Sequence, residues 1–382
     1  MKNKIHIYYW SPFISKVATV NAVLGSVKTL KAYSNQKYEP HIINAAGEWN
    51  KHKKELNENG INIIKLTDSK IIDNSNYTGF FKSRLTYLYL FLILLVPLLR
   101  LLKKNPPDYF IIHLITPLPL LINHFFNIKT KTILRISGLP KLNIIRKFFW
   151  KKTLKNIFHI TCPTKATTSY IRELKIVSPE KVSTLYDPIL NTRIINKKKG
   201  ERSSFKLNNF YLAIGRLTKQ KNFRFLIDVF SEFTKFSNNN LIIIGEGEEK
   251  KSLQKIIEKK NLKDKIILVG FKNNVFKYLK KSKCFILSSL WEDPGFVLVE
   301  SAYMNIPIIS SDCDNGPKEI LANGKSGILF KSNDKASLLN ALLKFENMDN
   351  KVINEKLLNC KKGIKAFTYF NHFKSLEKIL EY

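Results

Sequence analysis

The stretch WEDPGFVLVE, residues 291–300, places two carboxylates around a Pro-Gly step. The run before it, KCFILSS, has the continuous apolar character of a buried strand. Glu292 is therefore predicted in the loop after a strand and Glu300 in the helix that follows, with Pro294 in the first turn of that helix. Two carboxylates so placed can accept hydrogen bonds from sugar hydroxyls. The alternative is that both merely favour the N-terminus of a helix.

The start of this predicted helix is a candidate anion site. The N–H groups of Gly295, Phe296 and Val297 have no partner within the helix, and the helix dipole favours negative charge there. A second loop supplies cations, because AIGRLTKQKNF delivers Arg216 at a strand end and Lys221 five residues later. Arginine can grip two phosphate oxygens and lysine adds a compact charge, which together fit a diphosphate. An ordinary basic loop is the alternative.

In a third stretch, IIIGEGEEKKSL, Gly245 and Gly247 come directly after a predicted strand. Glycines there allow a tight turn with the backbone close to a ligand, although a plain strand-to-helix turn gives the same pattern. The triplet Asp312-Cys313-Asp314 could in principle hold a divalent cation. The seven histidines are scattered and the four cysteines form no CxxC pair, so the cysteines are predicted to be buried thiols in a reducing compartment.

The predicted elements that position these residues follow the same order in both halves of the chain. Short apolar strands alternate with helices in both halves of the chain, which predicts α/β architecture with parallel sheets covered on both faces. The length of 382 residues exceeds what one core usually supports. We therefore predict two Rossmann-like domains over residues 1–190 and 191–366, followed by a helical segment over 367–382. The polar stretch 190–209 is predicted as the linker.

Charge and one apolar segment suggest partners. The chain has 64 Lys+Arg against 30 Asp+Glu, a formal net charge of +34, which attracts polyanions such as nucleic acid, anionic lipid or phosphorylated small molecules. LTYLYLFLILLVPLLRLLKK is apolar on every face from Leu85 to Leu99. It is interpreted as a buried core helix, as a helix exposed to the bilayer surface, or, least favoured, as a membrane span. No signal peptide is visible at the start of the sequence.

Residues 211–330 resemble the retaining glycosyltransferases of family four, which have the GT-B fold. The similarity rests on the Glu-x7-Glu spacing of WEDPGFVLVE, on SAYMNIPIISSDCDNGPKEIL after it and on GRLTKQKN upstream. WSPFISKVATVNAVLGSVKTLKAY and RISGLP resemble the bacterial members that build surface polysaccharides such as lipopolysaccharide O-antigen and capsule. The fold implied is two facing Rossmann-like domains (GT-B) whose C-terminal helix, here residues 367–382, crosses back and packs on the first domain.

The resemblance also implies residue roles. Catalytic roles fall to Glu292, His113, Arg216 and Lys221. Donor binding falls to Arg216, Lys221, Gly245, Gly270, Phe271, Gly295, Phe296, Val297 and Glu300. Glu292 would contact the donor sugar, Glu300 the ribose, and the residues near Gly270 the base. His113 would approach the transferred sugar or, alternatively, be a structural histidine; Arg135 and Ser137 are weaker candidates.

The family implies transfer with retention of anomeric configuration, without cofactor or metal. The expected partners are a nucleotide diphosphate sugar, a glycan acceptor on polyprenyl diphosphate and the anionic inner face of the cytoplasmic membrane, but not nucleic acid. The chain departs from the family in SPFISK, where relatives often have paired glycines and where Ser15 or Lys16 would have to substitute. It also has Asp293-Pro294 where many relatives have Gly-Phe, which puts contacts from that loop to the sugar in doubt.

Two other classes stay open at this point. A sugar-nucleotide 2-epimerase also uses two Rossmann-like domains, and it would convert its donor without any acceptor. A basic nucleic-acid-binding protein is suggested by charge alone, because the aromatic residues lie in apolar runs rather than interleaved with basic ones.

Overall fold

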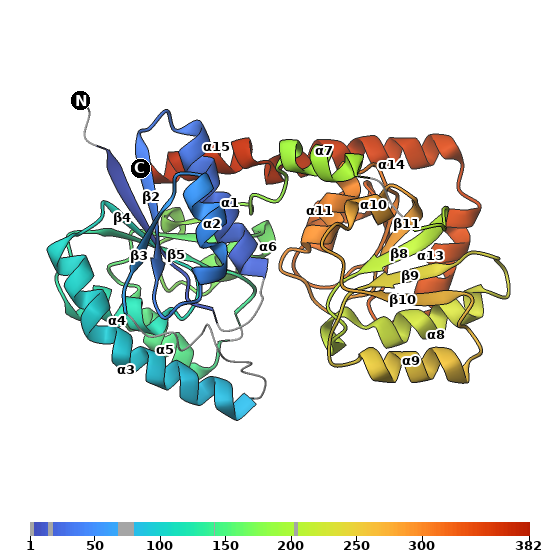
Figure 1. Ribbon diagram of the computed structural model, residues 1–382, viewed down its shortest axis with the longest axis horizontal. Helices are drawn as coiled ribbons and strands as arrows, with labels where there is room; N and C mark the ends of the chain where they lie inside the picture. Colours follow the sequence, from blue (N-terminus) through green and yellow to red (C-terminus); the bar gives the residue numbers. More distant parts are fainter. Residues whose placement is uncertain (1–3, 14–17, 68–79, 141, 202–204) are drawn as a thin grey trace. The chain divides into compact units, whose positions relative to one another are not determined.

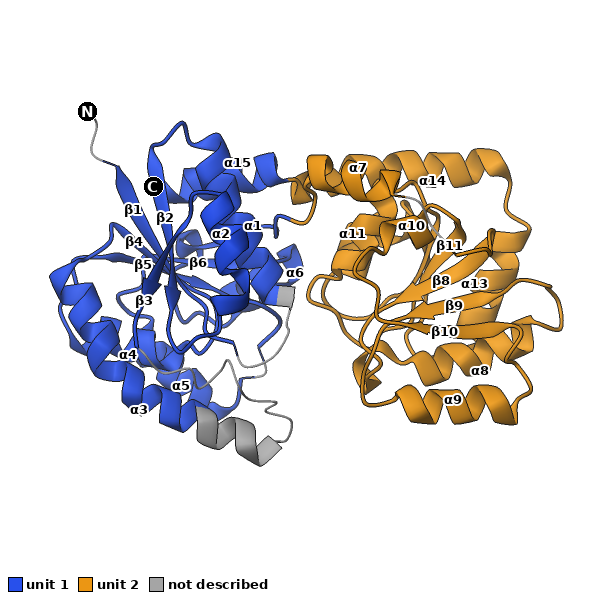
Figure 2. Ribbon diagram, viewed as in Figure 1, with its two compact units in different colours: residues 1–188, 369–382 blue, residues 189–368 orange. Residues whose placement is uncertain are grey.

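A computed structural model describes residues 4–13, 18–67, 80–140, 142–201 and 205–382. For residues 80–86 it describes the backbone alone. The chain divides into two compact units (Figures 1 and 2). Unit 1 comprises Met1–Pro188 and Tyr369–Tyr382, and unit 2 comprises Ile189–Thr368. These boundaries lie two residues from the positions 190 and 366 chosen from the sequence.

Unit 1 is built on a seven-stranded sheet in the order β3-β2-β1-β4-β5-β6-β7, and every pairing between neighbours is parallel. Strands such as β4 are buried along their whole length, as expected when helices cover both faces of a sheet. The strands are β1 (Ile5–Trp10), β2 (Tyr38–Asn44), β3 (Asn62–Lys65), β4 (Tyr109–Ile112), β5 (Lys131–Arg135), β6 (His159–Cys162) and β7 (Val182–Thr184).

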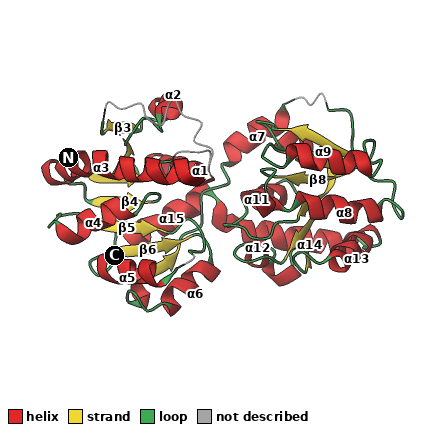
Figure 3. Ribbon diagram, turned by 90° about the horizontal axis from the view of Figure 1, so that it is seen from below, coloured by secondary structure: helices red, strands yellow, loops and turns green. Residues whose placement is uncertain are grey.

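Helices cover the two faces of this sheet (Figures 1 and 3). One apolar core joins the sheet to α1 (Ala18–Tyr33), α2 (Lys53–Glu58) and the C-terminal helix α15 (Tyr369–Leu380). The core on the other face takes in α3 (Phe80–Lys104), α4 (Pro117–Phe125), α5 (Ile144–Thr153) and α6 (Lys165–Glu173). Each helix therefore contributes one apolar stripe to a core.

The return of α15 to unit 1 is fixed by a buried chain of hydrogen bonds. His372 Nδ1 lies 2.6 Å from the Tyr186 carbonyl oxygen, which can only accept, so Nδ1 carries the proton. His372 Nε2 then accepts from Ser26 Oγ at 2.9 Å, and Ser26 Oγ accepts from the Tyr9 hydroxyl at 2.9 Å. Burial lowers the pKa of His372 to about 3, which keeps the imidazole neutral.

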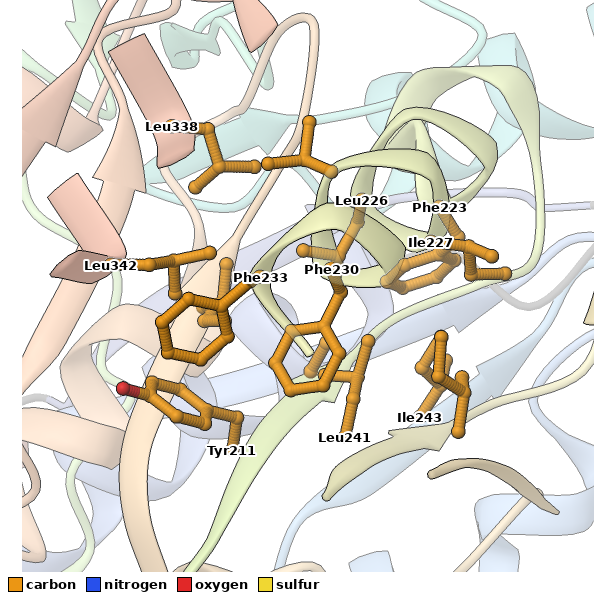
Figure 4. Packing of buried hydrophobic residues seen from close by; sticks show 14 of the residues in the cluster. Tyr211, Phe223, Leu226, Ile227, Phe230, Phe233, Leu241, Ile243, Leu338 and Leu342 are labelled. Atoms are coloured by element: carbon orange, nitrogen blue, oxygen red, sulfur yellow. The ribbon is translucent and has the colours of Figure 1, made fainter. Parts of the chain in front are cut away.

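Unit 2 holds a six-stranded parallel sheet in the order β10-β9-β8-β11-β12-β13. Its core packs Tyr211 and Leu241 of the sheet against Phe230 and Phe233 of α8 (Phe223–Phe233) and Leu342 of α13 (Lys335–Glu346) (Figure 4). The strands are β8 (Phe210–Ile214), β9 (Leu241–Ile244), β10 (Ile266–Gly270), β11 (Ser282–Leu287), β12 (Ile308–Ser311) and β13 (Ile328–Phe330). The helices are α7 (Thr192–Gly200), α8 (Phe223–Phe233), α9 (Lys250–Lys259), α10 (Phe276–Leu279), α11 (Phe296–Tyr303), α12 (Pro317–Ile320), α13 (Lys335–Glu346) and α14 (Asn350–Gly363).

The predicted linker over 190–209 is partly wrong, because its first half is the helix α7 of unit 2. The Asn191 side chain caps α7 by accepting the Ile194 N–H at 3.1 Å. Ile195 is the one residue of α7 that is buried, so the helix shows little apolar periodicity in the sequence. Residues 202–204 lie outside the described part of the chain.

The apolar segment at 85–99 forms most of α3, and its described residues are only partly buried. Leu90, Leu94 and Leu98 face the core at spacings of four residues, whereas Leu88 and Leu92 on the other side are exposed. No helix in the described part of the chain is both long and apolar enough to cross a bilayer. All four cysteines are free and buried, as predicted.

Candidate active site

The residues predicted in unit 2 meet at one edge of its sheet. Arg216, Gly245 and Gly270 stand at the carboxyl ends of β8, β9 and β10, and Glu292 follows β11. These four strands are neighbours in the sheet and run parallel, so their carboxyl ends lie at the same edge. Ligands of open α/β sheets bind at this edge.

The loop after β8 is joined to the loop after β11. The Leu290 N–H donates to the Gln220 carbonyl oxygen at 2.8 Å, and Gln220 Nε2 donates to the Trp291 carbonyl oxygen at 3.0 Å. Ser288 Oγ donates to the Lys221 carbonyl oxygen at 2.8 Å. The two loops that carry the predicted cations and the first glutamate are thus held together by three hydrogen bonds.

Lys221 and Glu292 form a buried ion pair between these loops. Their side chains are 15% and 5% exposed. Ser289 Oγ donates a further hydrogen bond to Glu292 Oε1 at 2.5 Å. The carboxylate is therefore oriented by two partners and shielded from solvent, while Arg216 on the same loop is exposed and lies 3.4 Å from Gln220 Oε1.

The helix after Glu292 begins later than predicted. α11 starts at Phe296, and Gly295 precedes it with φ of +99°, a left-handed conformation that suits glycine. Pro294 therefore lies before the helix rather than in its first turn, which corrects the prediction. A Cβ at Gly295 would lie 3.6 Å from Glu292 Cγ, so the carboxylate stands next to the helix start. The N–H groups of Phe296 and Val297 precede the first hydrogen bond of α11, from Leu298 N to Gly295 O.

Glu300 lies one turn further along α11. Burial raises the pKa of its carboxyl to about 7, against the opposing effect of the nearby Lys198 ammonium of α7. A carboxyl with this pKa is half-ionised at neutral pH. It can therefore accept hydrogen bonds from neutral hydroxyls, and this ability depends on pH.

The glycine turn after β9 brings two backbones into contact. Gly245 has φ of +155°, and a Cβ there would lie 1.8 Å from the Gly215 carbonyl oxygen. The Gly245 N–H also donates to the Gly270 carbonyl oxygen at 3.1 Å. Gly245 thus permits the close approach of the β8 and β9 ends, beside Gly270 and the exposed Phe271 at the end of β10.

His113 lies in unit 1, at the carboxyl end of β4, and is buried. The backbone N–H of His113 donates to the Trp10 carbonyl oxygen at 2.8 Å. The ring atom Nδ1 has no partner among the described residues. Burial, followed by the charge of Arg135, lowers the pKa of His113 well below its ordinary value, so the imidazole is neutral. His113 lines a cavity of about 10 Å³ with Arg135, Asp187 and His372, which is room for a single water molecule.

Arg135 is buried in the interior of unit 1. Its guanidinium donates to Asp187 Oδ1 at 2.5 Å and to the Leu185 carbonyl oxygen at 2.6 Å, and the side chain is 4% exposed. Ser137 Oγ is buried without a partner among the described residues. Ser15 and Lys16 lie outside the described residues.

Several partners of the site residues were missed from the sequence, namely Ser288, Ser289, Gln220, Lys198 and Asp187. The Ser288-Ser289 pair at the end of a buried strand was a signal, since polar residues there face the ligand edge of a sheet. Gln220, Lys198 and Asp187 act on residues that are distant in the sequence, so no local sequence pattern indicates their roles.

The Asp312 and Asp314 pair is engaged within unit 2. Asp312 Oδ1 accepts the Ser332 N–H at 2.8 Å, and Asp312 Oδ2 lies 3.6 Å from Lys318 Nζ. The Asp314 carbonyl oxygen accepts the Glu292 N–H at 3.3 Å. Among the residues that the structure describes, no group of three His, Cys, Asp or Glu side chains is placed to hold a metal ion.

The chain is similar to known glycosyltransferases in sequence and in fold. Residues 195–365 match the family described as "Glycosyl transferases group 1". An uncharacterized glycosyltransferase of Methanocaldococcus jannaschii is 35% identical over 269 residues, which cover 61% of this chain and 66% of that protein. A UDP-Gal:alpha-D-GlcNAc-diphosphoundecaprenol alpha-1,3-galactosyltransferase of Escherichia coli is 28% identical over 323 residues, covering 75% of this chain and 77% of that enzyme.

Among solved structures, a glycosyltransferase from Rickettsia africae is similar over 99% of this chain and 98% of its own, with a TM-score of 0.76 and 16% identity. At this identity the likeness concerns the fold alone. It confirms the predicted fold of two Rossmann-like units with a C-terminal helix that returns to the first.

Proposed function

Because this chain belongs to the group 1 glycosyl transferases, we propose that it transfers a sugar from a nucleotide diphosphate sugar to a glycan acceptor on a polyprenyl diphosphate. The observation that carries the proposal is the buried Lys221–Glu292 pair next to the start of α11. The ammonium and the helix N-terminus suit a diphosphate, and the oriented carboxylate suits the hydroxyls of the attached sugar.

The proposed reaction breaks the bond between the anomeric carbon and the diphosphate. Positive charge develops on the sugar and negative charge on the departing phosphate. Arg216, Lys221 and the N–H groups at the start of α11 would stabilise the departing charge, and such preorganised contacts are usually the largest electrostatic contribution to catalysis. The acceptor hydroxyl would attack on the face from which the diphosphate leaves, and its proton would pass to the departing phosphate oxygen, so that the anomeric configuration is retained.

The acceptor part of the proposal is supported by a relative. The enzyme of Escherichia coli acts, by its name, on GlcNAc linked to diphosphoundecaprenol. An acceptor of this kind is anchored in a membrane, so we place the protein at the inner face of the cytoplasmic membrane, in surface polysaccharide synthesis. We also propose that transfer needs no metal, because Lys221, Arg216 and a helix N-terminus would supply the charge that a cation would otherwise provide.

The test is transfer by the purified full chain to a synthetic polyprenyl-diphosphate-linked GlcNAc, with UDP- and GDP-sugars as donors. We expect one donor to give a longer glycan, with unchanged rate in EDTA and with an anomeric proton coupling in the product that matches the donor. Consumption of donor without acceptor would instead support an epimerase. Loss of transfer in EDTA, restored by Mn²⁺, would exclude the metal-independent mechanism.

Neither other class is favoured. The epimerase alternative shares the two-unit fold, but the relatives described above are glycosyltransferases. The nucleic-acid alternative rested on charge alone, and retention of DNA or RNA on the protein at low salt would be needed to revive it.

The raised pKa of Glu300 predicts that the affinity for the nucleotide sugar depends on pH. If its carboxylate accepts hydrogen bonds from the ribose, protonation near pH 7 removes the negative charge and leaves one weaker acceptor oxygen. The sign follows, because lowering the pH through a raised pKa converts the carboxylate into the neutral acid. We expect the dissociation constant of the nucleotide sugar to rise about tenfold between pH 8 and pH 6. Calorimetry with the intact nucleotide sugar measures this, since its diphosphate does not titrate in that range.

The Glu300→Gln variant is the control for this prediction. It cannot ionise, so its donor affinity should be weaker at pH 8 and nearly constant down to pH 6. Burial also raises the pKa of Glu48, in unit 1, to about 7. A pH dependence that persists in Glu300→Gln would therefore assign the titration to another group and refute the ribose contact.

A further inference from the structure

The helices α3, α4 and α5 cover the same face of the unit 1 sheet (Figure 1). All three expose large apolar side chains. On α5, Ile144 is 89%, Ile145 is 78% and Phe148 is 63% exposed. Single exposed apolar residues are ordinary, but three within five consecutive residues of one short helix form a patch that usually marks an interaction site.

The patch continues on the helices next to α5. α4 packs beside both α5 and α3, and its last residue, Phe125, is 71% exposed. On α3, Leu88, Leu92 and Val96 follow each other at spacings of four residues and are exposed, while the opposite stripe of α3 enters the core. The apolar side chains that α3, α4 and α5 expose are called here the α3–α5 surface.

The part of the chain that carries this surface is almost entirely basic. Residues 74–172, which include all three helices, contain 16 Lys+Arg and one acidic residue, Asp108. The Asp108 carboxylate accepts the His6 N–H at 2.7 Å, at the start of β4. Exposed basic residues lie beside the exposed apolar residues in the same helices, namely Arg100, Lys103 and Lys104 on α3 and Lys147, Lys151 and Lys152 on α5.

We propose that the α3–α5 surface docks on an anionic lipid bilayer. Its isoleucine, leucine and phenylalanine side chains would enter the boundary between headgroups and acyl chains. The long lysine and arginine side chains beside them would reach the lipid phosphates. A nucleic acid would use the charge but leave the apolar side chains in water, so a bilayer matches both properties of the surface.

The docking surface belongs to unit 1, whereas donor binding is proposed in unit 2. Vesicle binding therefore tests the surface without a donor, an acceptor or turnover. The benefit to catalysis, access to an acceptor held in the membrane, rests on the proposed function, but the docking itself does not.

The experiment is flotation of the full chain with vesicles of phosphatidylcholine alone and of phosphatidylcholine with 30% phosphatidylglycerol. We expect binding to the anionic vesicles that weakens as salt rises. The Ile144→Ser/Phe148→Ser variant should lose at least tenfold in partitioning. The Lys147→Gln/Lys151→Gln/Lys152→Gln variant should lose up to about a hundredfold at low salt and most of the salt dependence.

A matched control removes two exposed apolar side chains from unit 2. Phe236 and Leu358 are 66% and 61% exposed, so Phe236→Ser/Leu358→Ser should bind vesicles like the unchanged protein. Unchanged binding by Ile144→Ser/Phe148→Ser, or equal binding to neutral and anionic vesicles, would overturn the proposal. A dimer in solution that this same variant dissociates would show that a second copy covers the surface instead. Nucleotide binding should be unaltered in all variants, which separates docking from the proposed transfer.

Discussion

Replacing Lys221 with methionine is expected to lower turnover by about 10²–10³-fold at saturating substrates. Methionine keeps the length of the side chain but removes the charge that would stabilise the departing diphosphate. It also removes the partner that orients the Glu292 carboxylate. Initial rates at saturating donor and acceptor measure the effect, because a contact made mainly in the transition state changes kcat rather than KM.

The same substitution should destabilise unit 2, since it leaves Glu292 buried without its cation. Breaking a buried ion pair typically costs about 3–5 kcal/mol. The Lys221→Met/Glu292→Gln variant removes both charges and should recover most of that stability while staying inactive. Lys219 on the same loop is exposed, so Lys219→Met is a control that should retain both activity and stability. Full activity of the double variant would show that the pair is structural.

Much of the candidate site in unit 2 could be predicted from the sequence. Residues that follow apolar strands, such as Arg216 and Gly245, come together because the carboxyl ends of neighbouring parallel strands share one edge. Chain order within such a sheet thus becomes spatial proximity. The same reasoning places Glu292 with them, although it lies 71 residues after Lys221.

The partners of those residues could not be predicted. Lys221 pairs with Glu292, and Gln220 bridges the same two loops. Both contacts depend on the conformations of the loops after β8 and β11, which hydrophobic periodicity does not predict. α7 was missed because its one buried residue, Ile195, leaves no amphipathic pattern. The start of α11 was misplaced because a Pro-Gly step is compatible with a first helical turn as well as with the turn that precedes it.

The apolar run in α3 shows a different limit of sequence analysis. All its faces are apolar, so the sequence could not tell a core helix from one that contacts a bilayer. The structure separates them by burying the stripe of Leu90, Leu94 and Leu98 and exposing that of Leu88 and Leu92. The strongest exposure lies on α5, where Ile144 and Ile145 stand among charged residues and raise little hydropathy signal.

Replacing Arg135 with methionine is expected to destabilise unit 1 by about 3–5 kcal/mol. The guanidinium is buried, and its loss leaves the Asp187 carboxyl and the Leu185 carbonyl oxygen without their donor. Burial already raises the pKa of Asp187 against the charge of Arg135, so without Arg135 this carboxyl would take up a proton more readily. Denaturant unfolding followed by circular dichroism measures the change.

The Arg135→Met/Asp187→Asn variant separates charge from packing. If the cost comes from the uncompensated carboxylate, the double variant should be clearly more stable than Arg135→Met alone, because no buried charge is left unpaired. Lys129→Met, at an exposed position before the same strand, should leave stability unchanged. His113 provides a second readout: Arg135 helps to lower its pKa, so the His113 imidazole should titrate at higher pH in Arg135→Met by NMR. A His113 titration unchanged in this variant, together with unchanged stability, would contradict the coupling of the two residues across their shared cavity.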